Sequence, residues 1–157
     1  MPSYMFDTNI FNRILDGAVE ISEFRGKAHF YATHVQCKEL KATPNVRRRE
    51  ELLTIFEEVV GNNKIPTESF VLNVCDLDEA KLTVEESNLY SQITTELDNR
   101  RKKPNNVQDA LIAEAAVKNA LTLVTHDSDL FLVATKFDAA CANVYQVMRE
   151  LKRQNAT

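Results

Sequence analysis

Two short apolar runs in the sequence end at an aspartate. Tyr4–Phe6 stops at Asp7, and Leu121–Thr125 is followed, after one histidine, by Asp127. Both runs have the composition of buried strands, and ligand sites in open parallel sheets lie outside the carboxyl ends of the strands. We therefore expect the two aspartates to meet at one edge of a sheet. Their carboxylate oxygens are ligands that Mg²⁺ and Mn²⁺ prefer.

Two further acids stand in segments that are predicted to be helical. Asp109 opens the alanine-rich segment Val107–Ala120, and Glu39 lies on the helix after the second predicted strand. By spacing alone, Glu57 or Glu58 could take the place of Glu39. Four converging carboxylates cannot all stay ionised without a cation between them. A divalent cation held there would neutralise the charge that grows on a phosphodiester during hydrolysis.

Each acid also has an ordinary structural interpretation. Asp7 and Asp109 could cap helices, Glu39 could be a solvated helix residue, and Asp127 and Asp129 could form an Asx turn. An acid that directly follows a buried strand, twice in one chain of alternating strands and helices, is more than capping requires. The setting therefore favours a functional site.

The elements that must position these acids alternate along the chain. Strands are predicted at Tyr4–Phe6, Ala28–Thr33, Phe70–Val74, Leu121–Thr125 and Asn143–Val147. Helices are predicted at Ile10–Leu15, from Thr33 to near Pro44, at Val46–Val60, from about Asp78 to Asp98 and at Val107–Ala120, with a loop at Arg100–Asn106. This alternation predicts a parallel sheet covered by helices on both faces.

Composition places further bounds on the protein. The length of 157 residues suits one domain, 1–157, and the net charge of −4 argues against binding nucleic acid by positive field alone. Three scattered cysteines are typical of reduced thiols in a cytosol. The sequence shows no membrane-length apolar run and no secretory signal, so a cytoplasmic protein without a membrane partner is expected.

The acids and their flanking residues together resemble the PIN-domain nucleases. Asp7–Phe11 is similar to the family's opening Asp-x-Asn signature, and Glu39 matches its second acid. Asp109–Ala113 resembles the third motif, an acid followed by Ala-Leu-Ile-Ala. Leu123–Phe131 resembles the fourth, with Leu130 inserted before the usual aromatic residue. The motifs occur in family order over nearly the whole chain.

Within that family the length and layout look most like the VapC-type toxins of toxin–antitoxin pairs. The resemblance implies a three-layer α/β/α sandwich with a central parallel sheet of about five strands. It also implies an endoribonuclease that depends on Mg²⁺ or Mn²⁺, leaves a 5′-phosphate and a 3′-hydroxyl, forms a homodimer and is silenced by a cognate antitoxin.

The resemblance and the chemistry of the acids suggest a role for each residue. Asp7 and Asp109 are expected to be the main metal ligands, with Asp127 binding directly or through water. Glu39 would bind a water molecule or orient the nucleophile, which completes the catalytic set. Three positions are expected to support these ligands from behind: Asn9, Thr125 and Asp129.

One basic segment lies shortly before the third acid. It could hold RNA phosphates beside the metal site, or it could be a solvated loop at a helix C-terminus, where cations are favoured anyway. Its residues are Arg100, Arg101, Lys102 and Lys103.

Three other functions compete with the toxin hypothesis. A PIN-type nuclease of RNA processing or decay, without an antitoxin, would have the same site. A non-catalytic PIN-like module that binds RNA or protein would lack acids, whereas all four positions are filled here. A haloacid-dehalogenase-like phosphatase needs a second aspartate two residues after the first, where this chain has Asn9.

Overall fold

The core of the protein is a parallel sheet of four strands. The computed structural model describes residues 1–71, 74–75 and 88–155. Within them the strands are β1 (Ser3–Phe6), β2 (His29–Tyr31), β3 (Thr122–Val124) and β4 (Cys141–Ala142), in the spatial order β2-β1-β3-β4. All pairings are parallel, and Met5 lies opposite both Tyr31 and Leu123. The predicted α/β class is confirmed.

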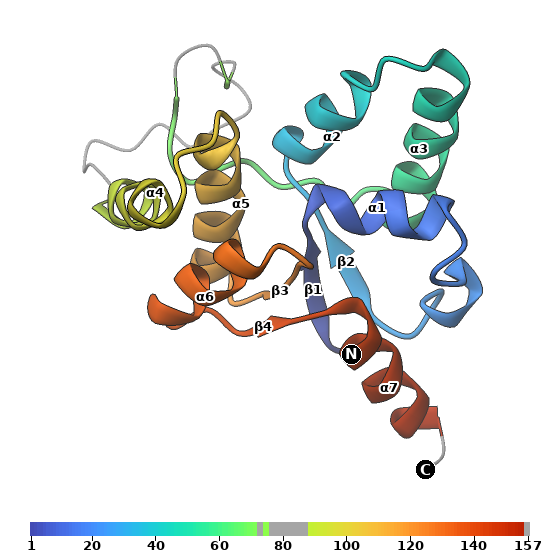
Figure 1. The fold of residues 1–157 in the computed structure, drawn as a ribbon. Helices are drawn as coiled ribbons and strands as arrows, with labels where there is room; N and C mark the ends of the chain where they lie inside the picture. Colours follow the sequence, from blue (N-terminus) through green and yellow to red (C-terminus); the bar gives the residue numbers. More distant parts are fainter. Residues whose placement is uncertain (72–73, 76–87, 156–157) are drawn as a thin grey trace.

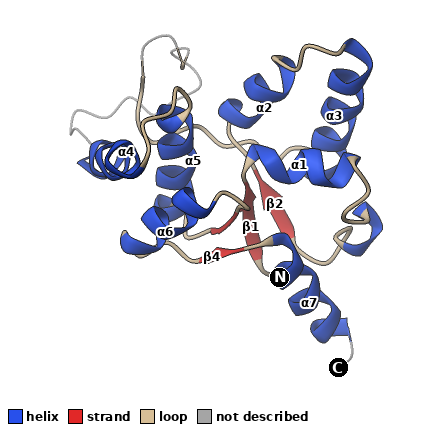
Figure 2. Cartoon of the chain, viewed as in Figure 1, coloured by secondary structure: helices blue, strands red, loops and turns tan. Residues whose placement is uncertain are grey.

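Helices cover both faces of this sheet, as Figures 1 and 2 show. They are α1 (Thr8–Leu15), α2 (His34–Lys41), α3 (Val46–Val59), α4 (Asn88–Arg100), α5 (Asn106–Lys118), α6 (Ser128–Lys136) and α7 (Val144–Asn155). Helices α1, α3 and α7 pack into one hydrophobic cluster, and α4, α5 and α6 pack into a second. No helix of the described residues is long and apolar enough to cross a membrane.

The alternation of side chains along β1 separates the two clusters. Tyr4 and Phe6 belong to the cluster with α1, and Met5 belongs to the cluster with α5. The Phe6 ring lies 4.9 Å from Phe30 and 5.7 Å from Phe24, measured between ring centroids. A strand with large apolar side chains on both faces is stable only when both faces are covered. The three-layer arrangement follows from this pattern.

Polar side chains begin several of the helices near the sheet. Asp7 caps α1, and Asn45 caps α3. Thr33 begins α2 in a capping box with Gln36, which is completely buried. The Gln36 side chain also donates to the carbonyl of Phe6 at 3.0 Å, so it ties α2 to the end of β1.

Two predicted strands differ from the structure. Phe70 and Val71 are not in a strand, and part of that prediction lies outside the described residues. Next to β2 the structure has an isolated parallel bridge between Ala32 and Lys64 instead of a further strand. The prediction of a strand at Asn143–Val147 is wrong, because Asn143 and Gln146 exchange backbone-to-side-chain hydrogen bonds that start α7.

Two helices differ from the sequence-based expectation. Helix α6 was not predicted, although Asp127 caps it and Leu130, Val133 and Ala134 form its buried face. The first half of the helix predicted from about Asp78 lies outside the described residues, and the second half is confirmed as α4.

Gln36 offers a test of how α2 is anchored to β1. Gln36→Ala should lower the free energy of unfolding by about 2–3 kcal/mol, because it leaves buried polar groups of Thr33 and Phe6 without partners. The matched control is Gln146→Ala in the exposed capping box of α7, which should cost about 0.5–1 kcal/mol. Urea denaturation measures both values, and equal losses would contradict the anchoring role.

A candidate carboxylate site at the carboxyl edge of the sheet

The predicted acids lie near the carboxyl ends of β1 and β3, the two central strands of the sheet. From these two strands the chain continues toward opposite edges of the sheet. From β1 the chain continues to β2 on one side, whereas β3 lies on the other side. Such a reversal of strand order leaves a crevice at the carboxyl edge, where ligands of α/β proteins bind. Asp7 directly follows β1, and its backbone N–H donates to the carbonyl of Val124 at 2.9 Å.

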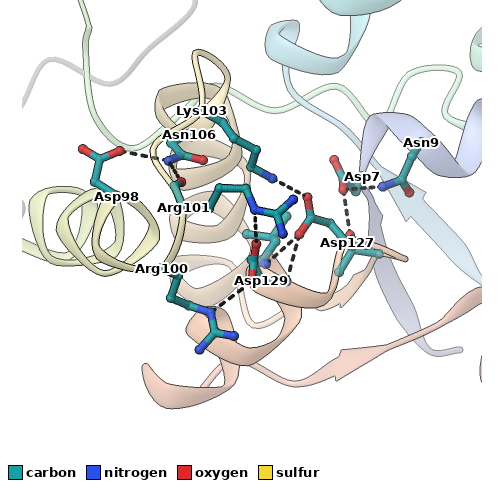
Figure 3. A network of polar contacts seen from close by, with 11 residues as sticks. Asp7, Asn9, Asp98, Arg100, Arg101, Lys103, Asn106, Asp127 and Asp129 are labelled. Atoms are coloured by element: carbon teal, nitrogen blue, oxygen red, sulfur yellow. Dashed lines mark hydrogen bonds and ion pairs between the residues drawn. The ribbon is translucent and has the colours of Figure 1, made fainter.

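Asp7 is buried, with only 5% of its surface exposed, and three donors surround its carboxylate. Oδ1 accepts from the backbone N–H of Thr8 at 2.8 Å. Oδ2 accepts from the Asn9 amide at 3.0 Å and from the Thr125 hydroxyl at 2.7 Å (Figure 3). Burial nevertheless raises the pKa of Asp7, even though the hydrogen bonds from Thr125 and Thr8 oppose that shift.

Glu39 comes to the same edge from α2. Its Oε1 accepts from the Thr8 hydroxyl at 3.1 Å, so Thr8 contacts both Asp7 and Glu39. Burial, and then the charge of Asp7, raise the pKa of Glu39 to about 7. The alternatives lie elsewhere, since Glu57 pairs with Lys64 at 2.7 Å and Glu58 pairs with Arg25 at 3.5 Å.

Asp109 lies in the first turn of α5 and is 4% exposed. Among the described residues its carboxylate has no hydrogen-bond partner, so Asp109 does not cap the helix. Burial raises its pKa to about 8, and the charges of Asp7, Glu39 and Asp127 act in the same direction. An acid whose charged form is disfavoured by burial and by neighbouring acids, and which makes no capping bond, is not explained by a structural role.

Asp127 combines a helix cap with an ion pair. Its Oδ1 accepts from the backbone N–H groups of Asp129 and Leu130, at 2.9 and 3.0 Å. Its Oδ2 accepts from the ammonium of Lys103 at 3.1 Å. Burial acts to raise the pKa of Asp127, but the hydrogen bonds from Leu130 and Lys103 outweigh it and hold that pKa below its ordinary value.

The residues expected to support the acids divide into two groups. Asn9 and Thr125 both donate to Asp7, and Thr125 also accepts from the backbone N–H of Asp127 at 3.0 Å. Asp129 instead pairs with Arg100 at 3.1 Å and lies 3.9 Å from Arg101. Asn9 and Thr125 thus lie against the acids. Asp129 instead contacts the basic segment (Figure 3).

Thr8 is a residue of the site to which the sequence analysis assigned no role. Its backbone and hydroxyl donate to two different acids. The available signal was its position next to Asp7, but only the approach of α2 to α1 shows that its hydroxyl reaches Glu39.

The donors at this edge suit a hard divalent cation in their chemistry. Asp7, Glu39 and Asp109 offer only oxygen atoms, and Oδ1 of Asn9, beside Asp7, is buried and has no hydrogen-bond partner in the described part of the chain. Within the described ranges, however, no three His, Cys, Asp or Glu side chains are already grouped closely enough to hold a metal ion. An ion would have to draw the carboxylates together.

Two cavities lie near these elements. A cavity of about 370 Å³ adjoins Asp127 and is lined by Phe131, Leu132 and Asn143 as well. Another of about 630 Å³ lies between α2 and α3, on Cys37, Lys41 and Leu53, away from Asp7 and Asp109. Of these two cavities, the smaller one adjoins an acid of the site, Asp127.

Comparison with known proteins gives a fold relationship. No family model and no curated protein match the sequence. Among solved structures, VapBC2 from Rickettsia felis, bound to a DNA fragment from their promoter, has a TM-score of 0.58 at 17% identity, covering 90% of this chain and 98% of that chain.

Two further structures agree with this match. FitAcB from Neisseria gonorrhoeae has a TM-score of 0.50 and VapBC-1 from nontypeable Haemophilus influenzae one of 0.51, each at 17% identity over 90% of this chain. The two matches cover 98% of the FitAcB chain and 97% of the VapBC-1 chain. The chain described here therefore has the PIN-like α/β fold of these VapBC and FitAB structures.

Proposed function

We propose that this protein is a metal-dependent endoribonuclease that hydrolyses RNA phosphodiester bonds, and that it is the toxin of a toxin–antitoxin pair. The observation that carries the proposal is the group of acids at the carboxyl edge, in which Asp7 and Asp109 are buried and Glu39 is half-buried. The pKa values of all three are raised. Strongly perturbed acids in a crevice are typical of functional sites.

The proposed chemistry gives each acid a separate task. Asp7 and Asp109 hold Mg²⁺ or Mn²⁺, which supplies charge neutralisation for the reacting phosphate when bound. Asp127 supports the ion directly or through water. Glu39, with its pKa near neutrality, accepts a proton from the attacking water or orients it. Asn9 and Thr125 fix the orientation of Asp7.

The basic segment is proposed to meet the RNA backbone. Arg100 is half-exposed and pairs with Asp129, whereas the Arg101 side chain is 71% exposed and Lys102 is also exposed. Cations on a loop beside the acids can hold phosphates on either side of the scissile bond. This contact compensates for the net charge of −4, since the acids face an ion rather than the RNA.

The toxin role is supported by the structural relatives. The solved structures with the same fold include VapBC2 and VapBC-1, and the sequence motifs resemble those of VapC-type toxins. We propose a cognate antitoxin partner, a homodimer and a cytoplasmic location for this chain by analogy. A nuclease of RNA processing without an antitoxin is the second candidate, and a small gene directly adjacent that silences the activity would decide for the toxin.

Substitution of the acids tests the nuclease proposal. Asp7→Asn and Asp109→Asn should each lower the rate of RNA cleavage by about 100-fold or more, because several kcal/mol of charge stabilisation depend on the ion they hold. Cleavage of total cellular RNA with Mg²⁺ or Mn²⁺ measures the rate, and EDTA should abolish it. Circular dichroism checks that each variant is folded.

The choice of Glu39 has its own matched control. Glu39→Gln should lower the same cleavage rate, whereas Glu57→Gln, which alters only an exposed ion pair with Lys64, should leave it unchanged. Loss of activity in Glu57→Gln alone would show that the second acid is assigned wrongly. Equal cleavage by the wild type and Asp7→Asn would refute the nuclease proposal.

The raised pKa of Asp109 predicts a pH-dependent stability. Because the pKa is about 8 in the folded protein and 3.8 ordinarily, the folded state binds more protons between these values. The free energy of unfolding should therefore fall as pH rises from 5 to 8 in EDTA. Asp109→Asn should reduce that fall and be about 2–4 kcal/mol more stable at pH 8.

Urea denaturation at pH 5 and pH 8 measures this difference. Glu57→Gln is the control, since it removes an acid that lies outside the site. Part of the fall should remain in Asp109→Asn, because Glu39 shifts in the same direction. An identical pH dependence in the wild type and Asp109→Asn would contradict the electrostatic description of the site.

A further inference from the structure

Lys103 is the most enclosed cation of the basic segment and the one that contacts a site acid. Its Nζ lies 3.1 Å from Oδ2 of Asp127, and the two side chains are 25% and 23% exposed. Arg100 and Arg101, which contact Asp129 instead, are 43% and 71% exposed. The Lys103–Asp127 pair is thus partly withdrawn from water, where an ion pair is stronger than at the surface.

The loop that carries Lys103 is held in place by a buried amide. Asn106 is 1% exposed, and its Nδ2 donates to the carbonyl of Arg101 at 2.8 Å and to Asp98 at 2.9 Å (Figure 3). The backbone N–H of Asn106 donates in turn to the carbonyl of Lys103 at 3.2 Å. These hydrogen bonds hold the backbone of the loop in place, and they therefore fix the position of Lys103.

The position of Asp127 is linked to that of Asp7 through one hydroxyl. Oγ1 of Thr125 donates to Asp7 at 2.7 Å and accepts from the backbone of Asp127 at 3.0 Å. The positive charge of Lys103 acts to lower the pKa of Asp7 and of Asp109, as well as that of Asp127. Among the described residues, Asp127 has an ion-pair partner, whereas Asp7, Glu39 and Asp109 have none.

We propose that the ammonium of Lys103 takes the place beside Asp127 that a second divalent cation occupies in a two-metal centre. The chain then binds a single Mg²⁺ or Mn²⁺, held by Asp7 and Asp109, with Glu39 left to orient the attacking water. This inference rests on the proposed nuclease function and specifies its metal content. In two-metal sites the ions lie about 3.5–4 Å apart and clamp both sides of the reacting phosphate. Here a lysine supplies one of those positive charges. Its remaining N–H groups have no other hydrogen-bond partner among the described residues and can meet a phosphate oxygen.

Manganese binding to the full chain without RNA tests this inference. Isothermal titration calorimetry and the electron paramagnetic resonance signal of free Mn²⁺ both count bound ions. The wild type should bind one Mn²⁺ per chain. Lys103→Met, which removes the charge but keeps the length of the side chain, should bind two, and Lys103→Gln serves as a second neutral variant.

Three controls separate the role of Lys103 from a general loss of charge. Lys102→Met removes the neighbouring exposed cation and should still bind one Mn²⁺. Lys103→Arg keeps the charge and should also bind one. The double variant Lys103→Met with Asp127→Asn should return to one, because the additional ion depends on the released carboxylate.

The outcomes distinguish this inference from the proposed function. A wild type that binds two ions, or a Lys103→Met variant that still binds one, overturns the inference and leaves the nuclease proposal intact. A wild type that binds one ion but cleaves no RNA overturns the nuclease proposal, while the metal count supports the role of Lys103. A wild type that binds no Mn²⁺ overturns both.

Discussion

Carboxyl groups that are removed from water repel one another, and the carboxyl edge of this sheet brings four of them together. Asp7 is held there by three donors, two from α1 and its start and one from the residue after β3. That arrangement requires β1 and β3 to be neighbours and α1 to begin directly at the end of β1. The hydrogen bonds that stabilise the Asp7 carboxylate therefore depend both on the strand order and on the position at which α1 begins.

This arrangement of acids lowers the stability of the folded state. Asp109 is buried without a hydrogen bond among the described residues, on a helix whose neighbouring side chains fill the core against β1 and β3. The aromatic cluster around Phe6 and the apolar face of α5 supply the stability that offsets it. Lys103 relieves one of the four acids, which leaves the other three as the groups with raised pKa values.

Capping and chemistry are not exclusive uses of an aspartate in this fold. Asp7 and Asp127 each begin a helix and also face the site. A helix that starts directly at the end of a strand needs a side-chain acceptor there, so the position that caps is also the position that reaches the crevice. Asp109 is different, because its place in the first turn of α5 leaves its carboxylate free of capping bonds.

Local patterns determined much of this protein, and packing decided the rest. The apolar runs that end at Asp7 and near Asp127 made the parallel α/β fold and its acidic edge predictable, because the burial of a strand is a local property of the sequence. Only the approach of α2 to Thr8 shows that Glu39 lies beside Asp7, whereas Glu57 and Glu58 pair with cations elsewhere. The strand expected at Asn143–Val147 gave way to α7, since one reciprocal pair of hydrogen bonds outweighed β propensity. The pairing of Lys103 with Asp127 joins residues 24 positions apart, and a long-range ion pair of this kind depends on tertiary structure alone.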